Sequence, residues 1–290
     1  MKSSNQSWKL LTMPFGRSLD DALRQQHHAA QYIALTGRHL IPQKADDSNT
    51  NMELNPETGM LIGNPLTTGI KVGLRLNDLA LVFIDKDDNV VKTVLLDGKT
   101  KEQGFSLLKN TLKSLGTDTS ALKNELHYEI PLHALDKGAA FSVSDKKCFN
   151  ENLLYRVNAR LVLQQVVSGL KNAELVKIWP HHFDTGSFVS FSNDETGNIS
   201  QTIGLGLAIP DGMVNEPYFY LSFWDADPKN IPGNFTALKA GKWMMPQWNG
   251  AVLPLSEILQ EASATGQHLR VKTFFDEAVV AVIQHLKKKN

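Results

Sequence analysis

The sequence predicts an α+β fold in which two mixed halves, residues 1–150 and 151–290, each pack helices on a largely antiparallel sheet. Both halves contain segments of helical periodicity and segments of strand patterning. Turn signals follow strand-like segments at residues 87–89 and 210–212, and the first of these predicts a hairpin. With 290 residues, 42% of them hydrophobic and 21% charged, the chain is long enough to bury a sizeable core as one compact unit.

The first half is expected to begin with a long helix over residues 19–36. Apolar side chains recur there at near-helical spacing, and Gly37 is a typical helix-ending residue. Three strand-like segments follow a polar loop, at residues 70–76, 79–85 and 90–96. The Asp-Asp-Asn turn at 87–89 favours a hairpin between the last two. An amphipathic helix over 104–115 follows, before a mixed, turn-rich stretch.

The second half repeats this order of elements with different lengths. Helices are expected over 153–170 and near the C-terminus, where apolar residues between 275 and 286 share one face. Strand-like segments lie between the helices, at residues 175–179, 203–207 and 218–225. One interpretation is an internal duplication, in which 79–85 corresponds to 218–225. The other is that two α+β halves simply share common parts.

Charge and composition exclude several classes of protein. Thirty basic and thirty acidic residues give no net charge, whereas a nucleic-acid-binding protein normally carries a basic stripe. No stretch approaches the roughly 18 apolar residues of a membrane span, and no apolar region of a secretory signal follows Met1. The single Cys148 excludes an internal disulfide and a multi-cysteine zinc site. We therefore expect a soluble, cytoplasmic protein whose partners are neither nucleic acids nor membranes.

The densest chemistry in the chain is the motif Trp-Pro-His-His-Phe-Asp at residues 179–184. Gly204 and Gly206 follow in a strand-like segment, and the run Glu-Pro-Tyr-Phe-Tyr occupies 216–220. Together these features resemble an uncharacterised bacterial domain-of-unknown-function family over most of the chain. The resemblance implies no activity, substrate or catalytic residue, so the chemistry has to come from the residues themselves.

Imidazole and carboxylate groups are ligands that divalent transition metals accept. In an extended chain alternate side chains share a face, so His182 and Asp184 would lie together, opposite His181. A metal site needs at least one more ligand, for which Glu216, Asp211 or the pair Asp46 and Asp47 are open alternatives. The metal candidates are His181, His182, Asp184 and Glu216.

Two interpretations of the same motif need no metal. In the catalytic one, Asp184 orients the imidazole of His182, which then acts as a general base. In the structural one, His182 and Asp184 form a buried hydrogen-bonded pair that pins a bend, with Trp179 and Phe183 in the core. Ser187 follows a glycine but lacks the rest of the Gly-x-Ser-x-Gly pattern of a serine nucleophile.

Aromatic residues are concentrated between 218 and 248, where they either wall a pocket or fill the core of a sheet. The candidate substrate-binding side chains are Trp179, Tyr218, Tyr220 and Trp224. Glycine at 204 and 206 would admit a bulky neighbour such as a Trp ring. His27 and His28 are expected at the surface or partly buried on their helix.

The sequence therefore predicts a small-molecule-binding or hydrolase-like site around the motif, metal-assisted in one version. The alternative is a non-catalytic ligand-binding, structural or interaction protein in which the motif is a buried determinant of the fold. The two differ in whether the side chains after Trp179 open onto a cavity or are sealed inside the protein.

Overall fold

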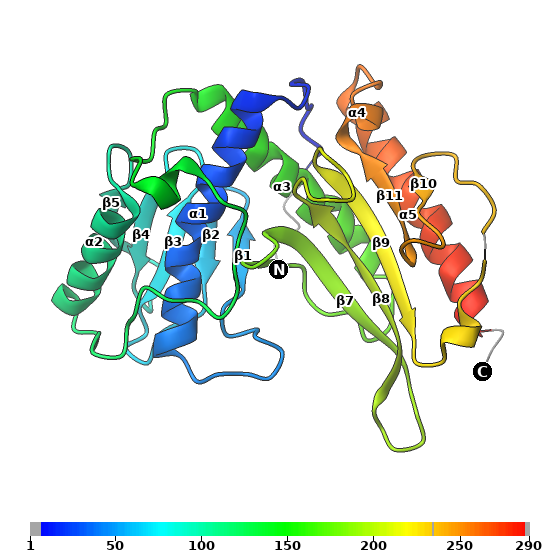
Figure 1. Cartoon of the computed structure of the whole chain (residues 1–290), viewed down its shortest axis with the longest axis horizontal. Helices are drawn as coiled ribbons and strands as arrows, with labels where there is room; N and C mark the ends of the chain where they lie inside the picture. The colour runs from blue at the N-terminus through cyan, green and yellow to red at the C-terminus, as the bar shows by residue number, and fades with distance from the viewer. Residues whose placement is uncertain (1–6, 234, 288–290) are drawn as a thin grey trace. The chain divides into compact units, whose positions relative to one another are not determined.

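The structure, a computed structural model, describes residues 7–233 and 235–287 and has the α+β fold that the sequence predicts. Figure 1 shows its helices and strands. The chain divides into two units, each built from separate segments. Unit 1 takes its described residues from Met1–Phe15, Leu154–Val176 and Asp184–Asn290, and unit 2 comprises Gly16–Leu153 and Lys177–Phe183. The sequence suggested a single division near residue 150; that the halves form one compact unit stays a prediction.

The sheet of unit 2 has the strand order β6-β1-β2-β3-β4-β5, with antiparallel neighbours. Its strands are β1 (Met52–Asn55), β2 (Met60–Gly63), β3 (Lys71–Arg75), β4 (Ala80–Ile84), β5 (Val90–Leu95) and β6 (Lys177–Trp179). β3, β4 and β5 fall where the periodicity predicts them. Every residue of β4 is buried, because its continuous apolar run is packed on both faces.

The long helix α1 (Arg17–Leu40) packs against β2 and β3, as the blue helix of Figure 1 shows. All its residues from Gln25 to Gly37 are buried, so the expectation that His27 and His28 lie at the surface or only partly buried is wrong. The helix also continues past Gly37, which was expected to end it. A Cβ at Gly37 would lie 2.3 Å from the carbonyl oxygen of Asn49, so this glycine allows a close approach of two backbones.

Unit 2 contains two further helices and the first part of a third, which is divided between the two units. α2 (Lys101–Ser114) begins with a capping box between Thr100 and Gln103. A short 3-10 helix, η1 (Ala134–Lys137), lies in the turn-rich stretch. α3 (Lys146–Val167) starts seven residues before the predicted helix, and the division between the two units falls inside it, after Leu153.

The sheet of unit 1 has the strand order β10-β11-β9-β8-β7, again with antiparallel neighbours. Its strands are β7 (Asp184–Asn193), β8 (Ile199–Ala208), β9 (Tyr218–Asp225), β10 (Lys242–Trp243) and β11 (Gly250–Pro254). Two helices, α4 (Leu255–Ile258) and α5 (Ala264–Lys287), and the 3-10 helix η2 (Pro228–Asn230) complete the unit.

The two faces of this sheet differ because side chains alternate along each strand. On one face α5 packs against β9 and β11, with the rings of Phe219 and Phe275 in edge-to-face contact at 5.9 Å. Tyr220 and Ser222 point to the opposite face and are half-buried, and Trp224 on that face is 47% exposed. We call this second face the open face of unit 1.

Both units contain an antiparallel sheet flanked by long helices, but internal duplication stays a prediction. Within the described ranges, no helix is both long and apolar enough to span a bilayer.

Candidate functional site

The motif at residues 179–184 forms the turn between β6 and β7. The division between the units falls within it, since Phe183 closes unit 2 and Asp184 opens unit 1. The two sides are therefore described separately, beginning with the turn in unit 2.

The turn is held to α1 through one backbone oxygen. The carbonyl of Pro180 accepts hydrogen bonds from Nε2 of His27 at 2.8 Å and from Nε2 of Gln31 at 3.0 Å. These two side chains are four residues apart and thus lie on one helix face. The donor role at His27 requires a proton on Nε2.

Phe183 is the second attachment of the turn. Its ring is fully buried and stacks in parallel on the imidazole of His27, with 4.8 Å between centroids and 1° between planes. Its backbone has φ +51°, a left-handed conformation that is uncommon for an aromatic residue. The burial and stacking of the ring offset the cost of this conformation. We call His27, Gln31, Pro180 and Phe183 the α1 anchor.

A tyrosine from the turn-rich stretch extends the α1 anchor. The hydroxyl of Tyr128 donates to Oε1 of Gln31 at 2.8 Å, and burial raises the pKa of this phenol. The Tyr128 ring also contacts the half-buried His181, with centroids 5.8 Å apart. His181 lies further against Trp179 at 6.3 Å, so aromatic rings surround the first histidine of the motif.

His182 differs from its neighbours because its side chain is exposed. His182 is therefore not the buried, hydrogen-bonded residue that the structural interpretation of the motif requires. The buried histidine that contacts the turn is His27 of α1. The interpretation of His182 as a general base oriented by Asp184 stays a prediction.

In unit 1, the half-buried Asp184 accepts a hydrogen bond of 2.6 Å from the hydroxyl of Tyr220. The two residues lie two strands apart, and glycines between them make the contact feasible. A Cβ at Gly206 would lie 2.8 Å from the Tyr220 hydroxyl, and one at Gly186 would lie 3.0 Å from it. Tyr220 therefore lies across β8 toward β7. The expectation that glycine admits a bulky neighbour is confirmed at Gly206, where the neighbour is the ring of Tyr220. Gly204 faces the hydroxyl of Ser222 instead.

Arg156 of α3 is a buried cation beside this carboxylate. Its Nη1 donates to the hydroxyl of Thr185 at 2.9 Å. Burial lowers the pKa of Arg156 to about 9, and the charge of Asp184 opposes that shift. The guanidinium is thus still cationic at neutral pH. Burial and the nearby Asp184 also raise the pKa of Tyr220, so the phenol stays protonated and donates. We call Asp184, Tyr220 and Arg156 the acid–phenol cluster.

The other aromatic candidates have different surroundings. Tyr218 is buried and donates to the carboxylate of Asp211 at 2.7 Å, and burial raises the pKa of its phenol. Its ring lies 6.4 Å from that of Tyr220, as does the ring of Trp248. Trp224 is exposed on the same sheet face, whereas Trp179 belongs to unit 2.

One of the proposed metal ligands, Glu216, forms hydrogen bonds with another residue. Glu216 accepts hydrogen bonds from the backbone N–H and the hydroxyl of Ser256, both at 2.7 Å, at the start of α4. Across residues 7–233 and 235–287, no group of three or more His, Cys, Asp or Glu side chains is arranged to hold a metal ion. The metal version of the hypothesis stays a prediction.

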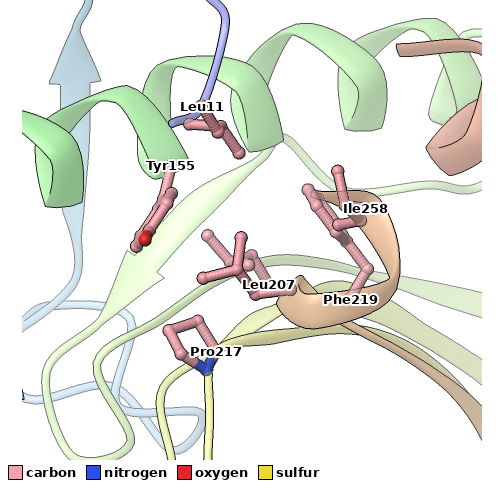
Figure 2. Close-up of a pocket in the computed structure, with 7 residues that line it drawn as sticks. Leu11, Tyr155, Leu207, Pro217, Phe219 and Ile258 are labelled. Carbon is pink, nitrogen blue, oxygen red and sulfur yellow. The ribbon is translucent and has the colours of Figure 1, made fainter. Parts of the chain in front are cut away.

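Unit 1 also contains a cavity lined by apolar side chains, which Figure 2 shows between α3, β9 and α4. Leu207, Phe219 and Ile258 line it, and its volume is about 10 Å³. That is about the space a single water molecule needs, and the lining is apolar. It is a packing gap and does not accommodate an organic ligand.

No protein-family model, curated protein or solved structure matches this chain. The resemblance based on the motif therefore stays a prediction.

Sequence reasoning missed His27, Gln31 and Arg156, which hold the two sides of the motif. A signal for the first two exists. The run from Ala29 to Leu35 is apolar at all but one position, which is typical of a helix buried on every side. Polar residues on such a helix must be hydrogen-bonded. Arg156 has no comparable local signal.

Proposed function

We propose that this protein binds a small organic molecule on the open face of unit 1, next to the acid–phenol cluster. The observation that carries the proposal is the half-buried carboxylate of Asp184, held at 2.6 Å by the hydroxyl of Tyr220. Asp184 is only half-buried, so part of the residue is accessible to solvent. In this proposal its carboxylate attracts ligand groups that donate hydrogen bonds or carry a positive charge.

The aromatic side chains define the rest of the ligand. Tyr220 and the half-buried Trp248 meet at 6.4 Å in an edge-to-face arrangement, and the hydroxyl of Tyr220 donates to Asp184. Aromatic surfaces of this kind bind flat, apolar parts of ligands, while a few polar tips fix the orientation. A ring compound that carries an ammonium or hydroxyl group fits both requirements. In this proposal the binding protein does not need His182 for chemistry.

The test uses tyramine, which joins a phenol ring to an ammonium group, and 4-hydroxybenzoate, which replaces the cation with an anion. Ligand-observed NMR should detect binding of tyramine at millimolar concentration. The protein should bind tyramine more tightly than 4-hydroxybenzoate. Asp184→Asn should weaken tyramine binding about 10-fold or more, since hydrogen bonds to charged groups contribute about 1.5–3 kcal/mol.

Two glycine variants provide a matched pair. A Cβ at Gly206 would lie 2.7 Å from the Thr185 carbonyl oxygen and 2.8 Å from the Tyr220 ring, so Gly206→Ala should displace the ring and weaken binding. A Cβ at Gly204 would meet only the rotatable hydroxyl of Ser222 within 4 Å, so Gly204→Ala should bind normally. Equal binding by wild type and Asp184→Asn would overturn the proposal.

For the part of the motif that lies in unit 2, a specific observation favours a non-catalytic, structural role. The carbonyl of Pro180 accepts two hydrogen bonds from α1, and Phe183 is fully buried on His27. We infer that the turn at Pro180–Phe183 stabilises unit 2. The free energy of unfolding of His27→Ala, compared with that of His182→Ala, tests this role.

A further inference from the structure

A larger cavity, of about 410 Å³, lies on the helix-covered face of the unit 1 sheet. It is bounded by the segment after α3, by β7 and β8, and by the last turns of α5. Small-molecule sites typically have volumes of about 300–1,000 Å³, so this cavity is large enough for an organic ligand. It is distinct from the open face, because its strand residues have the opposite parity to Asp184 and Tyr220.

The floor and walls of the cavity are apolar. Val189 and Phe191 of β7 and Ile203 of β8 form the floor, and Leu170 and Ile283 form the walls. Val189 and Ile203 are at most 1% exposed, whereas Leu170, Phe191 and Ile283 are half-buried. A hydrocarbon chain on this surface would cover apolar area that is now partly in contact with water.

Among residues 7–233 and 235–287, the charged side chains that line the cavity are those of Lys171 and Lys287, and none of the lining side chains is a carboxylate. Neither lysine occurs in the ion pairs found among the described residues. The cavity therefore combines an apolar interior with positive charge that no lining acid neutralises. Because α5 ends at Lys287, its backbone dipole is unfavourable for an anion, and the two ammonium groups would have to hold one.

The backbone around Lys171 is fixed to the sheet. The side-chain amide of Asn172 donates to the carbonyl of Ser190 at 3.3 Å, and the N–H of Glu174 donates to the carbonyl of Phe188 at 2.8 Å. Ala173 also forms a β-bridge with Val189. The cation thus projects from a segment held in place before any ligand arrives, which lowers the entropic cost of binding.

We propose that this cavity binds a single-chain carboxylate amphiphile of the fatty-acid class. The acyl chain lies on Val189, Phe191 and Ile203, and the carboxylate pairs with Lys171 and Lys287. Charge complementarity decides for an anion over a neutral lipid, because the cavity has two cations and no lining acid. The inference does not depend on the function proposed for the acid–phenol cluster.

The experiment titrates the full chain with laurate, decanoate and dodecanol below their micellar concentrations, by calorimetry. Each buried methylene contributes about 0.8 kcal/mol, so laurate should bind about 15-fold more tightly than decanoate. Laurate should also bind at least 10-fold more tightly than dodecanol, which has the chain without the charge. Asp184→Asn should leave laurate binding unchanged.

Two sets of variants locate the ligand. The double variant Lys171→Gln, Lys287→Gln should weaken laurate binding at least 10-fold and leave dodecanol unchanged. Ile283→Trp should fill the cavity and abolish laurate binding, whereas Val280→Trp, at a position that is 52% exposed on the same helix, should not. Thermal unfolding establishes which variants are folded, and if Ile283→Trp is not, the lysine variant carries the test. The inference is overturned if laurate does not bind, or binds the double lysine variant as tightly as wild type.

Discussion

The two sides of the motif are held by two different kinds of polar cluster. The α1 anchor in unit 2 consists of two side-chain donors that meet a backbone carbonyl, together with a stacked ring pair. The acid–phenol cluster in unit 1 joins a buried guanidinium, a half-buried carboxylate and a phenol. A neutral hydrogen bond contributes about 1 kcal/mol, whereas a buried charge that loses its partner costs about 3–5 kcal/mol. The difference is consistent with a role of the first cluster in the fold, and we propose that the charge of the second is used to bind a ligand.

The largest effect should come from removing the cation of the acid–phenol cluster. Arg156→Met keeps most of the volume but leaves Asp184 and the hydroxyl of Thr185 without their buried partner. We expect the free energy of unfolding in urea at pH 7 to fall by about 3 kcal/mol. Lys147→Met, at an exposed position of the same helix, is the control and should change stability by less than about 0.5 kcal/mol.

A double variant sharpens this result. Adding Asp184→Asn to Arg156→Met removes the carboxylate charge next to the lost guanidinium and should restore part of the lost stability. If Arg156→Met alone costs less than about 1 kcal/mol, the cluster is not held by a buried charge, and the contrast between the two clusters is lost.

The second prediction concerns the α1 anchor. His27→Ala removes the ring that stacks on Phe183 and one of the two donors to Pro180, while Gln31 still satisfies that carbonyl. The cost is therefore mainly that of a cavity, about 2–3 kcal/mol. Hydrogen exchange should show faster opening of β1 to β4 than in the wild-type protein.

His182→Ala is the matched control for this variant, since it truncates an exposed imidazole of the same motif. We expect a change within about 0.5 kcal/mol. The assignment of the structural role to His27 fails if the histidine at 182 proves the more costly of the two to remove.

Several elements were predictable because their patterns are local. β9 matches its predicted range of residues 218–225, since eight residues rich in aromatic and apolar side chains are typical of a strand. β7 was missed although it has ten residues. It alternates polar and apolar character irregularly, and Thr185 and Ser187 are buried polar residues that pattern analysis assigns to the surface.

The site was found only in part for a related reason. The chemical density of the motif pointed to Asp184, whereas Tyr220 was singled out in the aromatic-rich stretch and the glycines in a strand-like segment. The partners of the turn lie far away in sequence, since His27 is separated by 153 residues from Pro180 and Gln31 by 149. Local periodicity carries no information on such contacts.

The third prediction uses pH to change the charge of a neutral buried group on α1. Nε2 of His28 donates to the carbonyl of Pro131 at 3.2 Å, and its Nδ1 is buried without a hydrogen-bond partner among the described residues. Burial lowers the pKa of His28 from 6.5 to about 4; Asp136 opposes this shift and Lys101 adds to it. The unfolded chain therefore binds a proton at a higher pH than the folded protein.

Stability from this group is fully present above pH 6.5 and is lost as the pH falls toward 4. We expect the free energy of unfolding to be about 2 kcal/mol lower at pH 5 than at pH 7 on account of His28. His28→Gln should flatten that pH dependence, and urea titrations of both proteins at the two pH values measure it. An equally steep dependence in the variant would show that other groups cause it.

The smallest effect should come from the outermost bond of the α1 anchor. Tyr128→Phe removes the hydroxyl that donates to Oε1 of Gln31 at 2.8 Å, but Nε2 of Gln31 keeps its bond to Pro180. A single neutral hydrogen bond predicts a loss of about 1 kcal/mol in the free energy of unfolding. His127→Ala, which removes a partly exposed imidazole near Asp47, should cost less than about 0.5 kcal/mol. A loss for Tyr128→Phe as large as that for His27→Ala would mean that the turn-rich stretch, and not the helix, determines the position of Gln31.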